Sequence, residues 1–269
     1  MESPLGVFVP NEKEGLVDNA YGSLASWVYH VDKPIGRSFG DIEFYLSRLK
    51  GIGGPILEPA VGNGRFLIPL LEAGHVVHGF DASPHMLEVC KKEVSRRNLP
   101  DNVSKKNFED FVYSEKFSAV VMPAGSIQLI KSPIACLDFL KRLKVCLSET
   151  GKVILDIDSL SFMLDYGPES RMWSLGEDML TLTESRVKTS YLHQTTVSQL
   201  RYEHWSSGNL VSSELEVFSL RFWGVFEFKS LLHEAGFNDV SVTLDYKRPF
   251  SMSDSDATLG EVITFEASS

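Results

Sequence analysis

A glycine-rich turn between a short apolar segment and a helical pattern constrains this chain most. Residues 55–65 read Pro-Ile-Leu-Glu-Pro-Ala-Val-Gly-Asn-Gly-Arg and lead into the apolar run Phe66–Leu71. Ala60, Gly62 and Gly64 stand at alternate positions, so the backbone can take positive φ angles and nothing bulky blocks a ligand lying across the turn. Free N–H groups at the start of the following helix would face that ligand. The segment predicts a strand, a ligand-binding loop and a helix N-terminus.

Two carboxylates bracket this loop and narrow the ligand. The segment His75–Asp81 predicts a second strand, and its terminal carboxylate can accept hydrogen bonds from both hydroxyls of a ribose. Glu58 precedes the loop, where an acid would repel a pyrophosphate and favours an ammonium group instead. The pattern therefore disfavours a nicotinamide dinucleotide, although a strand-to-helix turn without a ligand stays open on these residues alone.

Helical and extended patterns alternate as far as residue 158. Such alternation predicts an α/β fold with a Rossmann-like, doubly wound sheet of seven strands, mostly parallel with the last strand antiparallel. Capping residues predict where three of the helices begin, at Asp41, Ser83-Pro84 and Ser132-Pro133. The predicted strands are Ile56–Glu58, His75–Asp81, Val103–Asn107, Phe117–Met122 and Val153–Asp158.

Polar–apolar alternation replaces this pattern after the fifth strand. It predicts an antiparallel β ribbon over residues 175–224, inserted after that strand and covering the active site, with a hairpin turn at Ser206–Asn209. A helix over Phe226–Ala235 and a strand pair complete the sheet. We expect N-terminal lid helices within residues 1–50, of which 1–20 are polar and irregular, and a main domain over 51–266.

Charge and cysteine content limit the partners. The formal net charge of −10 disfavours a nucleic-acid substrate, because an acidic surface repels a phosphate backbone. Cys90, Cys136 and Cys146 lack the spacing of a zinc site or a disulfide framework, so we expect buried thiols and no metal. Without a basic, apolar leader or a stretch of about 20 apolar residues, we expect a cytoplasmic protein with no membrane partner. The oligomeric state is open, and a homodimer is compatible with the sequence.

Taken together, these motifs resemble the class I S-adenosylmethionine-dependent methyltransferases, in the methyltransferase-domain group that acts on small molecules. The resemblance rests on 58–65, on Gly79–Leu87, on the Asn107-Phe108 pair and on weaker motifs at 117–126 and 228–237. It implies S-adenosyl-L-methionine as cofactor, with Arg65 near its carboxylate and Asp81 on its ribose. It assigns cofactor binding to Glu58, Ala60, Gly62, Asn63, Gly64, Arg65, Asp81, Ala82, Met86, Asn107, Phe108 and Pro123.

The acceptor side is less specific. Methyl transfer is an in-line displacement, so a protein base is needed only if the acceptor must lose a proton. Among six candidates (Tyr21, Tyr29, His30, His193, His204 and Asp158), Tyr29 and His30 rank first as catalytic residues. The predicted substrate contacts are Tyr21, Gln128, Trp205, Arg221 and Trp223, each of which can instead pack the core.

We therefore expect an enzyme that transfers a methyl group to an O or N atom of a small metabolite, with aromatic and heterocyclic acceptors among the candidates. Two alternatives remain open at this point: a nicotinamide-dependent oxidoreductase, and a non-catalytic module that binds a cofactor or another protein on the same fold.

Overall fold

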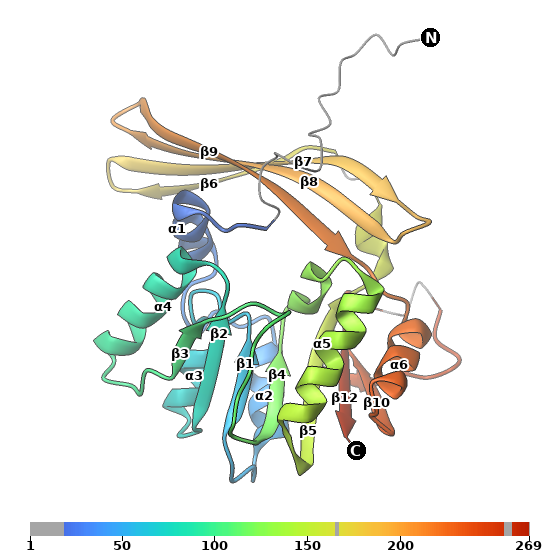
Figure 1. The fold of residues 1–269 in the computed structure, drawn as a ribbon. Helices are drawn as coiled ribbons and strands as arrows, with labels where there is room; N and C mark the ends of the chain where they lie inside the picture. The colour runs from blue at the N-terminus through green and yellow to red at the C-terminus, as the bar shows by residue number, and fades with distance from the viewer. Residues whose placement is uncertain (1–18, 165–166, 256–259, 269) are drawn as a thin grey trace.

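The computed structural model describes residues 19–164, 167–255 and 260–268. The segment 1–18, most of the predicted irregular N-terminus, lies outside the described residues. The described chain forms a large mixed sheet with helices on both faces, and a second, antiparallel sheet that lies across one end of it (Figure 1). The three cysteines are free and buried, as predicted. In the described part of the chain, no helix is long and apolar enough to cross a membrane.

The large sheet has the predicted doubly wound topology. Its strand order is β11-β10-β12-β5-β4-β1-β2-β3. Strands β1 to β5 are parallel, whereas β12 is antiparallel to both of its neighbours. The seven predicted strands are present, and the two-residue β11 adds an eighth. The bounds are β1 (Ile56–Pro59), β2 (Val77–Asp81), β3 (Val103–Lys105), β4 (Phe117–Met122), β5 (Leu147–Asp158), β10 (Asp239–Leu244), β11 (Arg248–Pro249) and β12 (Val262–Ser268).

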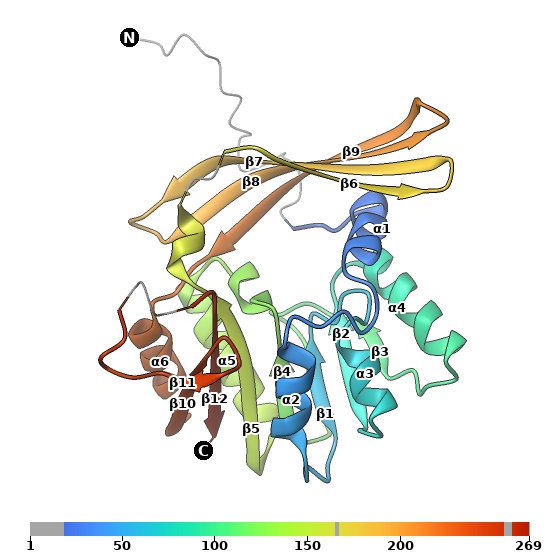
Figure 2. The same ribbon diagram turned by 180° about the vertical axis from the view of Figure 1, so that it is seen from behind.

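Helices cover both faces of this sheet because its strands are apolar on both sides (Figures 1 and 2). Ile56 packs into one cluster, with α2 (Asp41–Leu49), α3 (Leu67–Glu72) and α4 (Pro84–Arg96). Its neighbour Leu57 packs into the other, with α5 (Pro133–Cys146) and α6 (Val225–Glu234). Successive residues of a strand point to opposite faces, so one short apolar segment serves both layers.

The capping predictions held at two of three helices. Ser83 and Ser132 are N-caps, and their side chains accept hydrogen bonds from the backbone N–H groups of Met86 and Ala135. Asp41 is not an N-cap. Gly40 takes that position in the left-handed region with φ 94°, which leaves the Asp41 carboxylate free for a buried ion pair with Arg65.

The predicted ribbon is a four-stranded antiparallel sheet in the order β6-β7-β8-β9. It follows β5 through a short 3₁₀ helix, η2 (Leu160–Met163). The β8–β9 turn places both Ser207 and Gly208 at positive φ, which suits a two-residue hairpin. Its first strand was not predicted. The bounds are β6 (Glu169–Leu175), β7 (Asp178–Ser190), β8 (Thr195–Ser206) and β9 (Asn209–Arg221).

The first helix, α1 (Ser23–Asp32), packs beneath this small sheet (Figure 2). Leu24, Ala25 and Val28 form an apolar cluster with residues of β7 and β8. The helix also contacts α4 of the large domain. It therefore lies between the two sheets.

Asp156 of β5 links three segments at the carboxyl edge of the large sheet through hydrogen bonds. Its carboxylate is fully buried and accepts hydrogen bonds from the hydroxyls of Thr264 and Tyr246, at 2.7 Å each, and from the N–H of Ala124 at 3.0 Å. Ala124 and Gly125 both have positive φ, so this carboxylate fixes a strained turn after β4.

Replacing Asp156 by alanine is expected to lower the free energy of unfolding by about 3 kcal/mol, because three buried donors lose their acceptor. Urea denaturation followed by circular dichroism measures this change. The exposed Asp239, at the start of β10, provides the control, since its alanine variant should stay within about 0.5 kcal/mol of the wild type. Equal effects of the two substitutions would contradict this role for Asp156.

Candidate active site

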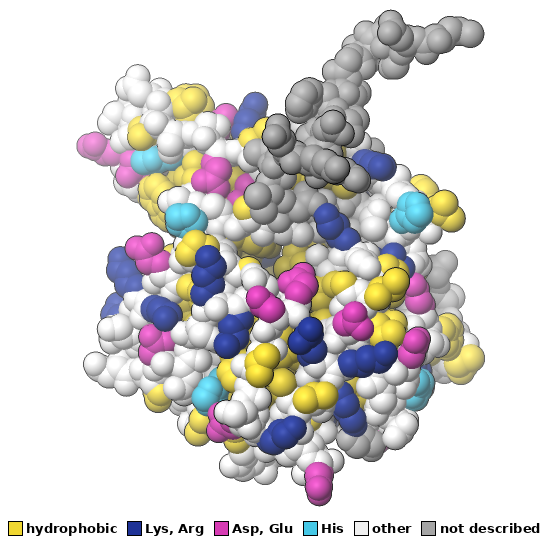
Figure 3. All heavy atoms as spheres, in the orientation of Figure 1, with side chains coloured by type: hydrophobic (Ala, Val, Ile, Leu, Met, Phe, Trp, Pro, Cys, Tyr) yellow, Lys and Arg dark blue, Asp and Glu magenta, His cyan; other side chains and the backbone are white. Residues whose placement is uncertain are grey.

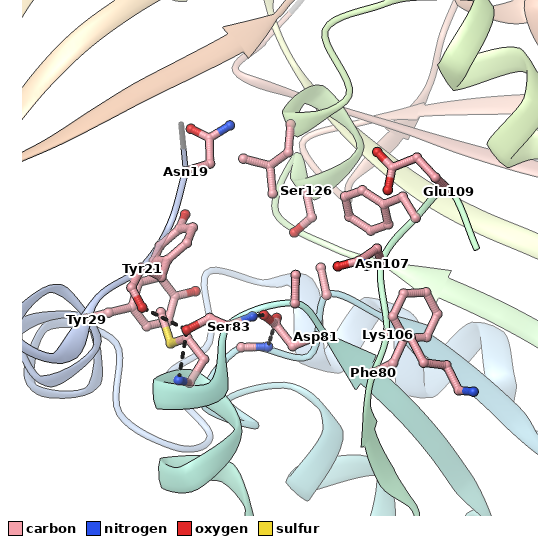
Figure 4. A pocket seen from close by; sticks show the side chains of 16 residues that line it. Asn19, Tyr21, Tyr29, Phe80, Asp81, Ser83, Lys106, Asn107, Glu109 and Ser126 are labelled. Atoms are coloured by element: carbon pink, nitrogen blue, oxygen red, sulfur yellow. Dashed lines mark hydrogen bonds between the residues drawn. The ribbon is translucent and has the colours of Figure 1, made fainter. Parts of the chain in front are cut away.

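A cavity of ≈ 430 Å³ opens at the carboxyl ends of β1 and β2 (Figure 4). Its volume lies within the range of small-molecule sites, about 300–1,000 Å³. It lies where the topology of a doubly wound sheet places ligands. The cavity is lined by Asn19, Tyr21, Tyr29, Ala60, Gly62, Phe80, Asp81, Ala82, Ser83, Met86, Lys106, Asn107, Phe108, Glu109, Ser126 and Leu129.

The loop after β1 has the predicted left-handed backbone. Ala60, Gly62 and Gly64 have φ angles of 57°, 55° and 85°. A Cβ on Gly64 would lie 2.9 Å from Sγ of Cys90 and 3.1 Å from Cδ1 of Ile68, so only glycine fits there. Gly62 has open space at its Cα and borders the cavity, which lets a ligand approach the backbone.

Asp81 ends β2 and reaches into the cavity wall. One of its oxygens accepts the N–H of Gly62 at 2.9 Å, and the other accepts the N–H of Ser83 at 2.8 Å. Burial raises the pKa of Asp81, and these backbone donors oppose that shift. Each carboxylate oxygen keeps a second lone pair, so the group can still accept hydrogen bonds from two ribose hydroxyls.

Glu58 is buried beneath the loop without a full set of partners. The residue is 2% exposed, and within the described residues its Oε2 atom has no hydrogen-bond partner. Burial raises the pKa of Glu58 well above its ordinary value, and the nearby Arg65 guanidinium opposes this. An unpaired buried carboxylate is costly unless a ligand complements it, and the ammonium of a methionyl group has the right charge.

Arg65 is already occupied by protein partners. Its Nη2 atom pairs with Asp41 at 2.6 Å, and its Nη1 atom donates to the carbonyl of Arg37 at 2.6 Å. Asn63 is also engaged, because its side chain donates to the carbonyl of Lys33 at 2.9 Å. Both residues thus join the loop to the N-terminal helices.

The described residues before α1, 19–22, form a short strap that connects the small sheet to the cavity. Glu216 and Glu214 of β9 accept the backbone N–H groups of Gly22 and Leu24, at 2.6 and 3.0 Å, so the sheet caps the helix. The Tyr21 carbonyl accepts the hydroxyl of Ser83 at 2.7 Å. The strap therefore contacts the N-terminus of α4 directly beside Asp81.

The two residues that ranked first as catalytic are separated by the structure. Tyr29 lines the cavity, where burial raises its pKa, so its phenol stays protonated and can donate a hydrogen bond but cannot serve as a base. His30 does not line it. Its Nδ1 atom lies 3.2 Å from Nδ2 of Asn63, and burial lowers its pKa.

The predicted cofactor residues divide between the cavity wall and the layer behind it. Seven of them line the cavity: Ala60, Gly62, Asp81, Ala82, Met86, Asn107 and Phe108. Behind the wall lie Glu58, Asn63, Gly64, Arg65 and Pro123. Asn107 faces the cavity beside Glu109, and its side-chain carbonyl can accept from an adenine amino group (Figure 4). These roles remain predictions.

Of the predicted acceptor contacts, Tyr21 alone lines the cavity. Trp205 and Arg221 lie at opposite ends of β8 and β9, since Trp205 pairs with Leu210 and Arg221 pairs with Thr195. Ten residues along a strand span about 33 Å, so one small acceptor cannot touch both. Trp223 and Gln128 are 1% and 0% exposed and belong to the interior. Alternation placed these side chains on a ribbon but could not give their position along it.

Several residues of the cavity were not predicted from the sequence. Ser83 was recognised only as a helix cap, although it also borders the ligand space. Asn19 and Ser126 come from the strap and from η1 (Ser126–Leu129), which carry no periodic pattern. Pairing between the strap and β9 brings Asn19 there, through its backbone bond to Val217 at 2.9 Å, and such a contact between distant segments leaves no local signal.

Comparison with known proteins agrees with this geometry. Residues 56–151 match the sequence family described as a methyltransferase domain. The chain is 26% identical over 251 residues to the glycine/sarcosine N-methyltransferase of Aphanothece halophytica, covering 90% of this chain and 86% of the relative.

Solved structures extend the match to the whole fold. An S-adenosylmethionine-dependent methyltransferase from Clostridium acetobutylicum superposes with a TM-score of 0.73 at 14% identity, covering 90% of this chain and 96% of that one. The chain thus contains a methyltransferase domain and has the fold of the class I S-adenosylmethionine-dependent methyltransferases. An amino pentose methyltransferase from Micromonospora echinaspora, solved with S-adenosylmethionine bound, has a TM-score of 0.66 at 14% identity, covering 93% and 99%.

This result sets aside the nicotinamide-dependent oxidoreductase and the non-catalytic module. The site also fits S-adenosyl-L-methionine on its own evidence. The unpaired Glu58 carboxylate suits the ammonium, and the open backbone at Gly62 lets a ligand approach beside Asp81. When bound, the cofactor supplies an electrophilic methyl group.

Replacing Asp81 by asparagine is expected to weaken S-adenosylhomocysteine binding about ten-fold or more, because charge-assisted hydrogen bonds to the ribose become neutral ones. Isothermal titration calorimetry measures this, and Asp101→Asn, at an exposed acid, is the control. Unchanged affinity in a folded variant would contradict ribose binding by Asp81 and would limit its role to the hydrogen bonds with the backbone of Gly62 and Ser83.

Replacing Ala60 by glycine is expected to stabilise the methyltransferase by up to about 1 kcal/mol, because a residue with a Cβ pays for its left-handed backbone at φ 57°. Cofactor affinity should not fall, since the side chain that is lost is one methyl group. Thermal unfolding with and without S-adenosylhomocysteine tests both statements. A lower melting temperature would show that the Ala60 methyl packs favourably.

Proposed function

We propose that this methyltransferase transfers the methyl group to an amine nitrogen of a small molecule. The observation that carries this is the Asp158 carboxylate at the carboxyl end of β5. Within the described residues, neither of its oxygens has a hydrogen-bond partner, and Oδ2 lies 2.9 Å from where a Cβ on Gly125 would stand. Gly125 precedes Ser126, which lines the cavity. The acid thus lies beside the acceptor end of the site.

The protonation state of Asp158 suits an amine acceptor. Burial raises its pKa to about 6, and the Lys33 ammonium opposes this. The group is therefore mainly ionised at pH 7, attracts an acceptor ammonium and can take the proton that the nitrogen must lose before its lone pair attacks the methyl carbon. The products are a methylated amine, a proton and S-adenosylhomocysteine. Gln128 holds this acid in place by accepting its backbone N–H at 2.8 Å.

Aromatic rings complete the acceptor side. The rings of Tyr21 and Tyr29 meet edge to face at 6.1 Å, and those of Tyr21 and Phe218 at 6.2 Å. Ring faces attract ammonium groups and also accommodate flat acceptors, so an aromatic or heterocyclic amine fits the proposal. The relative named as a glycine/sarcosine N-methyltransferase supports nitrogen as the methylated atom.

We further propose that the N-terminal helices within residues 1–50 and the insertion over 175–224 cover the acceptor, while the domain over 51–266 holds the cofactor. A small molecule is favoured over nucleic acid by the net charge of −10. On the face shown in Figure 3, Lys and Arg side chains are interspersed with Asp and Glu rather than gathered into a basic stripe.

The test combines acceptor screening with a pH profile. A panel of amino acids, amino sugars and heterocyclic amines, assayed by S-adenosylhomocysteine release, is expected to yield N-methylated products. Replacing Asp158 by asparagine should lower kcat/KM about 100-fold or more and remove the acidic limb near pH 6, because that limb reports ionisation of the carboxylate. Turnover with hydroxyl acceptors alone would contradict the proposal.

A stability measurement checks the same variant independently of activity. The folded-state pKa of Asp158 is raised from 3.8 to about 6, so its contribution to stability is present below pH 4 and is lost as pH rises through 6. The asparagine variant should therefore be at least as stable as the wild type at pH 7. A large loss of stability at pH 7 would mean that the carboxylate is structural.

A further inference from the structure

Lys33 holds a fixed place beside the cofactor loop. It follows the last residue of α1, and its backbone N–H donates to the carbonyl of Tyr29 at 2.8 Å. Its own carbonyl accepts the side-chain amide of Asn63 in the loop at 2.9 Å. The Nζ atom lies 5.0 Å from the ring centroid of Tyr29, a residue of the cavity wall. These contacts place a lysine ammonium at the junction of helix, loop and cavity.

This ammonium has no hydrogen-bonded counter-ion among the described residues, although the Asp32 and Asp158 carboxylates oppose the lowering of its pKa by burial. In residues 19–164, 167–255 and 260–268, no hydrogen bond or ion pair reaches Nζ of Lys33. Its contact is a cation–π interaction with the ring of Tyr29. The adjacent Asp32 is engaged by Arg171 at 3.0 Å. Burial lowers the pKa of Lys33, as expected for a cation that has lost water without gaining a full partner.

A second cation beside the loop, the Arg65 guanidinium, already binds protein partners. Arg65 was expected beside the cofactor carboxylate, but its guanidinium binds Asp41 and the carbonyl of Arg37. The Asp41–Arg65 pair is buried, with the two side chains 1% and 5% exposed, so releasing it for a ligand would leave a buried charge uncompensated.

The two unpaired charges near the loop are opposite in sign. Glu58 offers a buried carboxylate oxygen without a partner, and Lys33 offers an ammonium without one. Both lie close to Arg65. Its guanidinium opposes the rise in the pKa of Glu58 that burial causes, and it adds to the lowering of the pKa of Lys33 by burial. The methionyl end of S-adenosylmethionine carries one ammonium and one carboxylate, so this pair matches its charges.

We propose that Lys33 binds the carboxylate of the cofactor's methionyl group, in the role that the sequence suggested for Arg65. Tyr29 orients the lysine side chain through its ring, and the Asn63–Lys33 hydrogen bond holds its backbone against the loop. The proposal rests on the cofactor and not on the nature of the acceptor, so it stands or falls separately from N-methylation.

The experiment deletes the charge from the protein and from the ligand in turn. Isothermal titration calorimetry compares S-adenosylmethionine with decarboxylated S-adenosylmethionine, which keeps the sulfonium and the ammonium. The wild type is expected to prefer the carboxylate-bearing ligand about ten-fold or more, because charge-assisted hydrogen bonds contribute that much. Lys33→Met should abolish this preference, and Lys33→Arg should retain most of it.

Lys106→Met is the matched control. Lys106 also lines the cavity but lies at the Asn107 side, over the ring of Tyr113. Its loss should change the affinity for both ligands by the same factor. Circular dichroism and thermal unfolding establish that each variant is folded.

A Lys33→Met variant that keeps the full preference for the carboxylate-bearing ligand would overturn the proposal. If that variant binds both ligands as the wild type does and instead raises KM for an acidic acceptor, the carboxylate bound by Lys33 belongs to the acceptor and the assignment to the cofactor is wrong.

Discussion

The structure depends on how it balances charge buried at one edge of a parallel sheet. The carboxyl ends of the strands meet there, and the chain places Glu58, Asp81, Asp156 and Asp158 along that edge. Unpaired burial of any one of them would cost several kcal/mol. The Asp156 carboxylate is stabilised by hydrogen bonds from two hydroxyls and a backbone N–H group. The Asp81 carboxylate is stabilised by two backbone N–H groups. Glu58 and Asp158 are left incompletely paired, and these are the two acids for which we propose ligand partners.

The same constraint explains why the N-terminal segment matters so much for a domain it precedes. Arg65 takes its partners from α2 and from the residues before it, and the Asn63 amide reaches back to Lys33. The small sheet in turn supplies Glu214 and Glu216 as caps for α1. Ligand loop, helix and small sheet are thus linked through hydrogen bonds in which charged or amide side chains meet the backbone. A change in the position of α1 has to alter the walls of the cofactor cavity and the acceptor side together.

Most strands and helices could be predicted from local patterns, because the apolar and capping residues of each segment depend on which of its faces are buried and where it begins. The run at Ile56-Leu57 is apolar on both sides, and Ser83-Pro84 marks a helix start that the structure retains. Strand β6 was missed because it is an exposed edge strand, whose residues alternate weakly. Asp41 was misassigned as a cap because sequence proximity to the helix could not reveal the distant Arg65.

The site was less accessible to sequence than the fold for a related reason. Residues that we expect to bind through the backbone, such as Ala60 and Gly62, can be predicted from the residue types that favour a turn, and their positive φ angles agree with such a turn. Side chains of the small sheet could be assigned to strands, but their distance from the cavity could not be predicted. Trp205 and Arg221 were therefore both predicted to contact the substrate, although they lie at opposite ends of the sheet.

Tyr29 shows how the two halves of the site meet. Tyr29 lines the cavity, its ring contacts the Lys33 ammonium, and the Arg65 guanidinium opposes the rise in its pKa that burial causes. Burial outweighs the effect of the nearby Arg65 cation, so the pKa of Tyr29 stays above its ordinary value and the phenol remains protonated. In the N-methylation that we propose, the proton-accepting role therefore falls to a carboxylate, that of Asp158. Asp158 is the last residue of β5, whereas the two groups that we propose for the methionyl end of the cofactor come from β1 and from the residue after α1.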